Sequence, residues 1–178
     1  LAVTALAIAG VVRSTLRQRE WRDGDALTRA AVRDSPRSWR AHANHADLLF
    51  RERRTAEARA AYTRAIVLAP SPWWIRHDFA RRLYEIGDHD AALAQLGTSL
   101  AEYPDQPGVL RDAVAVLITL GRYREARDIA ARMLDSGREV GDLARLARVA
   151  DSAFSAGAPP GVIRMRLSAA SPPVSRRP

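Results

Sequence analysis

Residues 73–106 read WWIRHDFARRLYEIGDHDAALAQLGTSLAEYPDQ, and this stretch decides the fold. Its first half carries apolar side chains three or four positions apart, at Ile75, Phe79, Leu83 and Ile86. This spacing puts them on one face of a helix. Gly87 can end that helix with a positive φ, and Asp88 can cap the next one. The second half has its own series, at Ala92, Leu96 and Leu100, before Pro104 ends the pattern. The stretch therefore predicts two antiparallel helices.

The same arrangement recurs along the chain. A shift of 34 residues superimposes Leu83 on Leu49 and on Leu117. Other positions agree at the same interval: Ala58, Ala92 and Ala126; Ala46, Ala80 and Val114; Gly87 and Gly121; Pro70 and Pro104; Trp39 and Trp73. A helix-turn-helix repeat with this period, small residues at the helix contact, a turn Gly and a closing Pro resembles the tetratricopeptide repeat. The resemblance extends over residues 19–157.

This resemblance implies an all-α fold, a right-handed α-solenoid of antiparallel helix pairs. Three positions depart from the family pattern. Arg53 stands in place of the turn Gly, His45 in place of a Leu, and Arg138 in place of the closing Pro. We therefore expect the first and third full repeats to be less regular than the second, and we interpret His45 as a partly buried structural histidine.

The period also predicts the domain organisation. Residues 19–38 are expected to form a half repeat whose helix packs inward through Leu27, Ala30 and Ala31. Residues 39–157 are expected to form three repeats and a terminal capping helix over 142–156. Residues 158–178 should contain a short helix over 162–169 and a disordered tail rich in Arg, Pro and Ser.

Residues 1–12, LAVTALAIAGVV, carry no charge, and four Arg follow within the next ten residues. Twelve residues rise about 18 Å as a helix, less than a bilayer core of about 30 Å. Since the chain begins at Leu1, we expect residues 1–18 to be the end of a transmembrane helix of a longer protein, which makes the chain membrane-associated. A buried helix packed on the first repeat and the remnant of a secretory signal are the alternatives.

The net charge of +8 suggests nucleic acid at first sight. All 28 basic residues are Arg, however, which is typical of a GC-rich, bacterial genome. The charge excess also lies at the ends. The tail contributes +4 through Arg164, Arg166, Arg176 and Arg177, and residues 13–22 contribute +3. A duplex-binding protein needs a basic stripe on its folded surface, so the pattern favours no nucleic-acid partner. The absence of Cys excludes disulfides and thiolate metal sites.

The sequence contains neither a Gly-rich phosphate loop nor a nucleophile elbow. His42 and His45 are three residues apart with Asp47 nearby, but helical zinc sites use pairs four residues apart. We therefore predict no catalytic residue, no metal and no cofactor for this chain.

Binding is the remaining function class. In tetratricopeptide arrays the first helix of each pair lines the concave surface, so the resemblance implies that polar residues there contact a partner. The candidates are Asn44, Asp47, Trp74, His77, Asp78, Arg81, Tyr84, Arg111 and Asp112. Carboxylates and Arg side chains in such a row could bind an extended peptide through charged hydrogen bonds, with Trp74 as an aromatic anchor. Alternatively, the row is a solvated face with internal pairs such as Asp78 with Arg82.

Some members of the family hold the C-terminal carboxylate of heat-shock chaperones with a clamp of Lys, Asn and Arg. The corresponding positions here are Ala43, Asp47, Asp78, Gly108 and Asp112. Because acidic residues there would repel a carboxylate, this class of partner is disfavoured.

The order of an apolar helix end, Arg-rich residues, Trp21-Arg-Asp and then repeats is similar to the C-terminal part of polytopic membrane glycosyltransferases of the O-mannosyltransferase-like group. Three functions are therefore open: a membrane-tethered protein-binding scaffold, the acceptor-binding domain of such an enzyme with its catalytic part upstream, and nucleic-acid binding through the Arg-rich ends. Resemblance to that enzyme group implies the periplasmic or lumenal side, whereas the positive-inside rule favours the cytoplasm, so the side stays undecided.

Overall fold

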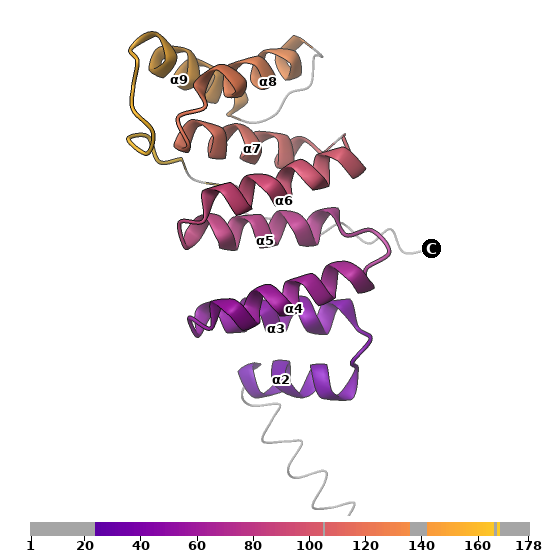
Figure 1. Ribbon diagram of the computed structural model, residues 1–178. Coiled ribbons are helices and arrows are strands. Elements are labelled where there is room, and N and C mark those ends of the chain that lie inside the picture. The colour runs from indigo at the N-terminus through magenta and orange to yellow at the C-terminus, as the bar shows by residue number, and fades with distance from the viewer. Residues whose placement is uncertain (1–23, 105, 136–141, 166, 168–178) are drawn as a thin grey trace, which may run out of the picture. The chain divides into compact units, whose positions relative to one another are not determined.

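The computed structural model describes residues 24–104, 106–135, 142–165 and 167, and within these ranges every regular element is a helix. The elements are α2 (Gly24–Asp34), α3 (Trp39–Arg51), α4 (Thr55–Leu68), α5 (Trp73–Glu85), α6 (His89–Glu102), α7 (Pro107–Thr119), α8 (Tyr123–Asp135) and α9 (Leu143–Ser155), as Figure 1 shows. The all-α prediction is confirmed. The chain divides into two compact units, residues 1–69 and 70–178, each described by itself below.

Unit 1 contains α2 and the helix pair α3–α4. The Ser38 side chain caps α3 by accepting a hydrogen bond from the Ala41 N–H at 3.3 Å. The contact between α3 and α4 is built around small side chains, since Ala46, Ala58 and Ala65 are completely buried. Tyr62 is also buried, and its hydroxyl donates a hydrogen bond to Asp47 Oδ1 at 2.8 Å.

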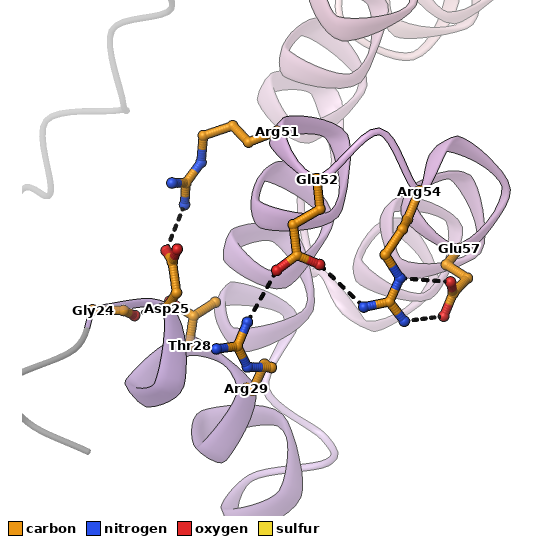
Figure 2. A network of polar contacts seen from close by, with 8 residues as sticks. All are labelled: Gly24, Asp25, Thr28, Arg29, Arg51, Glu52, Arg54 and Glu57. Carbon is orange, nitrogen blue, oxygen red and sulfur yellow. Dashed lines mark hydrogen bonds and ion pairs between the residues drawn. The ribbon is translucent and has the colours of Figure 1, made fainter. Parts of the chain in front are cut away.

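The turn between α3 and α4 lacks the Gly of the other turns, and Arg53 adopts φ +62° in its place. This left-handed conformation costs a non-Gly residue about 1–2 kcal/mol. An ion-pair network surrounds the turn, as Figure 2 shows: Glu52 lies between Arg29 and Arg54, each at 3.0 Å, and Arg54 donates two bonds to Glu57. These bonds from Arg54 lower the pKa of Glu57. The network links α2, the turn and the start of α4.

Unit 2 contains the pairs α5–α6 and α7–α8 followed by α9, which packs on both α8 and α7. Gly87 and Gly121 end the first helix of each pair with φ +86° and +75°, and Asp88 caps α6 by accepting from the Ala91 N–H. The side chains at the helix contacts are fully buried: Ala80, Ala92, Leu96, Val114, Ala126 and Ala130. The 34-residue period therefore positioned the core alanines correctly.

Three expectations differ from the structure. Leu27 of α2 is 37% exposed and Ile86 is 39% exposed, because each lies at the margin of its helix contact. The short helix expected over 162–169 is absent from residues 162–165 and 167. Pro159, Pro160 and Gly161 precede this segment, and its main chain bonds to α5 and α7 instead of to itself.

The membrane helix expected in residues 1–18 lies outside the described residues. Among the helices that the structure describes, none is both long enough and apolar enough to cross a bilayer.

Substitution of Ala92 by Arg should lower the free energy of unfolding of unit 2 by at least about 3–5 kcal/mol, because it places an unpaired charge between α5 and α6. Ala94→Arg on the exposed side of α6 is the matched control and should change stability by less than about 0.5 kcal/mol. Thermal and urea unfolding followed by circular dichroism would measure both. Equal melting temperatures for the two variants would contradict the assigned helix contact.

Replacement of His45, which stands where the family pattern has a Leu, tests whether this histidine makes the stability of the first repeat depend on pH. Burial, and then the charges of Arg54 and His42, lower the pKa of His45 below its ordinary value of 6.5, so the folded chain binds fewer protons than the unfolded chain. The stability from neutral His45 is fully present above about pH 6.5 and is lost as the pH falls towards the folded pKa. His45→Leu should reduce the decrease in melting temperature between about pH 7.5 and pH 5. If the variant lost as much melting temperature as wild type over this pH range, His45 would be excluded as a source of the pH dependence.

Candidate functional site

The first helices of unit 2, α5 and α7, are joined by side-chain hydrogen bonds along one face, here called the inner face. On α5 this face carries Trp74, His77, Asp78, Arg81 and Tyr84, which are three or four residues apart and therefore adjacent on the helix. On α7 it carries Arg111, Asp112, Ile118 and Thr119. Both helices belong to the same compact unit, and the pairs His77–Asp112 and Tyr84–Thr119 join them.

A buried polar network occupies one end of the inner face. His77 Nε2 and Asp112 Oδ2 are 2.8 Å apart, and both side chains are buried. Arg111 donates its Nε–H and Nη2–H to Asp112 Oδ1, and its Nη1 lies 3.5 Å from Oδ1 of Asp142, the residue before α9. Each Asp112 oxygen thus has a donor, which is what a fully buried carboxylate requires. The network joins α5, α7 and the start of α9.

The other end of the inner face holds a pair of hydroxyl groups. Tyr84 Oη and Thr119 Oγ1 are 2.9 Å apart. Both bond to the main chain of Met165, which lies 81 residues after Tyr84: the Tyr84 hydroxyl donates to the Met165 carbonyl at 2.6 Å, and the Met165 N–H lies 3.1 Å from Tyr84 Oη. The two hydroxyls therefore bond the main-chain N–H and C=O of Met165. Every non-proline residue has these two groups, whatever its side chain.

A cavity of about 790 Å³ adjoins this pair. It is lined by Arg81, Tyr84, Glu85, Ile86, Gly87, His89, Arg164, Met165 and Leu167. Two of its polar atoms, Arg81 Nε and His89 Nδ1, are buried and lack a hydrogen-bond partner within the described part of the chain. A buried polar atom without a partner costs of order 1–3 kcal/mol.

The residues predicted from the sequence divide between the two units. Asn44 is exposed on α3 of unit 1, where Asp47 is engaged by Tyr62. In unit 2, Trp74 and Asp78 are partly exposed, and Asp78 Oδ1 lies 3.4 Å from Arg81 Nη1. Asp112 has no exposed surface and supports the face from beneath.

Sequence reasoning missed Thr119, His89 and Met165 as parts of this site. Met165 fell in a segment expected to be helical, and His89 lies on α6, outside the first helices from which the candidates were drawn. A signal existed for α7: residues 113–118, AVAVLI, are apolar all round the helix, which indicates a helix covered on every side.

The His77–Asp112 pair is part of a closed hydrogen-bond network. His77 and Asp112 are hydrogen-bonded, but the network completes itself with Arg111 instead of presenting a nucleophile. Within residues 24–104, 106–135, 142–165 and 167, no group of three His, Asp or Glu side chains lies close enough together to hold a metal ion.

Comparison with protein families gives two matches, and both family models are described as tetratricopeptide repeat. One covers residues 12–71 and the other residues 83–149, which are 60 and 67 of the 178 residues. The first match begins before α2 and so includes the predicted half repeat. No curated protein matches the chain.

Removal of the Asp112 carboxylate by Asp112→Ala should lower the free energy of unfolding by about 3–5 kcal/mol, because it leaves the Arg111 guanidinium and His77 without their buried partner. Asp128→Ala on α8 is the matched control, since the Asp128 side chain is 56% exposed and its ion pair with Arg127, at 3.5 Å, is a surface pair. Its effect should be about 0–1 kcal/mol. Urea unfolding would measure both, and an equal effect would contradict the structural role of the network.

Proposed function

Because the chain belongs to the tetratricopeptide-repeat proteins, we propose that it is a non-catalytic scaffold that binds a protein, as an extended peptide, on the inner face of α5 and α7. The observation that carries this proposal is the cavity beside Tyr84, which Arg81, Glu85, His89 and Arg164 line together with apolar side chains. Asp78 pairs with Arg81 and Arg82 pairs with Glu85, so part of α5 is paired internally, through pairs other than the Asp78–Arg82 example named from the sequence.

The partly exposed residues would make the contacts, and the buried network would hold them in place. Trp74 offers a large aromatic surface near the start of α5, and Asp78 and Arg81 offer an acceptor and a donor one turn later. Preorganised side chains bind with less loss of conformational entropy than free ones. The rigid link from α5 through His77 and Asp112 therefore favours binding at this face.

Membrane attachment through residues 1–18 is a second proposal, and the uncharged run in residues 1–12 supports it. It predicts that the chain sediments with membranes and stays there after a high-salt wash, whereas deletion of residues 1–18 releases it. Recovery of the intact chain in the supernatant would exclude the tether. The role as an acceptor-binding domain of a membrane glycosyltransferase rests on residues 1–27 alone, and the side of the membrane stays open.

Substitution of the exposed contacts tests the scaffold function. Trp74→Ala and Asp78→Ala should each reduce recovery of a partner from a lysate by about tenfold, which corresponds to about 1.4 kcal/mol per contact residue. Arg124→Ala, on the exposed side of α8, is the matched control and should leave recovery unchanged. Quantitative mass spectrometry of the captured proteins gives the measurement. Equal recovery by all three variants would exclude the inner face as the binding site.

A further inference from the structure

The segment that follows α9 returns to the inner face of unit 2. Residues 156–165, here called the C-terminal strap, turn at Gly157 and Gly161, whose φ angles are +62° and +78°. In Figure 1 the trace after α9 runs back past α7 towards α5. The strap is fixed along this path, because the Tyr123 hydroxyl donates to the Pro159 carbonyl at 3.1 Å and the Gly161 N–H donates to the Thr119 carbonyl at 2.9 Å.

Alternate side chains at the end of the strap lie towards unit 2. Ile163 and Met165 are partly buried and Leu167 beyond them is too, whereas Val162 and Arg164 are exposed. The chain bends at Val162 and Ile163, and Arg164 and Met165 follow without helical structure. Ile163 and Met165 pack against the hydrophobic cluster that contains Ile118 of α7.

Helix α7 has the composition of a covered helix. Every residue from Asp112 to Thr119 is buried, including Ala115 and Ile118, which are turned towards the inner face by register. On α5 the corresponding residues Arg81 and Tyr84 remain partly exposed. The apolar inner side of α7 therefore needs an apolar cover, which the strap supplies through Ile163 and Met165.

The anchoring bonds at Met165 are independent of its side chain. Tyr84 donates to the Met165 carbonyl, and the Met165 N–H reaches both Tyr84 Oη at 3.1 Å and Thr119 Oγ1 at 3.4 Å. Any extended peptide presents the same N–H and carbonyl at every second residue on one side. The hydroxyl pair can therefore accept another chain in the same way.

We propose that Tyr84 and Thr119 form a subsite that binds the main chain of an extended peptide with apolar side chains at alternate positions, and that the strap occupies this subsite in cis. A partner peptide of this pattern must displace the strap from α7, so the free protein is self-occupied. This inference rests on the proposed scaffold function and specifies its ligand. Arg81 and His89 line the cavity beside Met165 and are available to the side chains of such a partner.

Competition between the strap and a free peptide tests the proposal. The probe is a fluorescein-labelled peptide of residues 160–168, PGVIRMRLS, titrated with the full chain and followed by anisotropy. Met165→Pro in the protein removes the N–H that Tyr84 and Thr119 accept while keeping the strap extended. When the strap occupies the subsite, the apparent Kd for the probe equals the intrinsic Kd divided by the fraction of molecules whose subsite is free. The variant should therefore bind the probe at least about tenfold more tightly than wild type.

Two matched variants separate the subsite from a general loosening of the strap. Val162→Ser changes a side chain that is 67% exposed and should leave probe affinity at the wild-type value. Tyr84→Phe added to Met165→Pro should reverse the gain by about fivefold or more, because it removes the hydroxyl and keeps the ring. Circular dichroism verifies that each variant is folded.

Equal probe affinity for wild type and Met165→Pro, or no effect of Tyr84→Phe, would overturn the subsite and its occupation in cis. Hydrogen exchange gives a second measurement: the amides of residues 162–165 should exchange faster in wild type when the probe is saturating, and an unchanged rate would likewise overturn the proposal. These outcomes would leave the scaffold function intact if Trp74→Ala and Asp78→Ala still reduced partner capture. If the scaffold function itself were wrong, partner capture would not depend on Trp74 or Asp78.

Discussion

The close approach of paired helices at single alanines is the contact on which the structure depends. Ala58, Ala92 and Ala126 begin the inward face of the second helix in each pair, and none of the three has exposed surface. At these points a larger side chain would separate the two helix backbones and remove the surrounding side chains from contact. The position of each first helix, and hence of every residue on the inner face, is set by these contacts.

Because these contacts are local in sequence, the sequence predicts them well. An interval of 34 residues, a turn Gly and a small residue at the crossing identify each pair without any knowledge of distant contacts. The turn forms although Arg53 replaces the Gly of the repeat pattern, because the surrounding backbone imposes the left-handed conformation that Gly would adopt freely. It also placed Trp74, Asp78, Arg81 and Tyr84 on one face of α5, since the helical period alone determines which residues share a face.

The rest of the site depends on contacts that no period encodes. Burial of Asp112 follows from its pairing with His77, which lies 35 residues away on another helix. The bond between Tyr84 and Met165 joins residues 81 positions apart, and Met165 lies beyond the last residue of the repeat match. The short helix expected over residues 162–169 is absent from residues 162–165 and 167, where the main chain of Met165 bonds to side chains of α5 and α7 instead. Periodicity therefore predicts which residues share a helix face. Which segment packs on that face depends on contacts between residues far apart in the sequence, which periodicity does not encode.

The apolar inner side of α7 connects these two levels. In a repeat array that exposes its inner face to water, the exposed positions of the first helices carry polar side chains, as Arg81 and Tyr84 do on α5. Helix α7 carries Ala115 and Ile118 there, and an uncovered apolar surface in water is unfavourable by roughly 25 cal/mol per Å². Release of the strap would remove the part of the cover that Ile163 and Met165 supply to the cluster containing Ile118. The apolar inner side of α7 therefore favours contact with an apolar segment. It disfavours both an inner face open to water and a ligand that offers only charged groups.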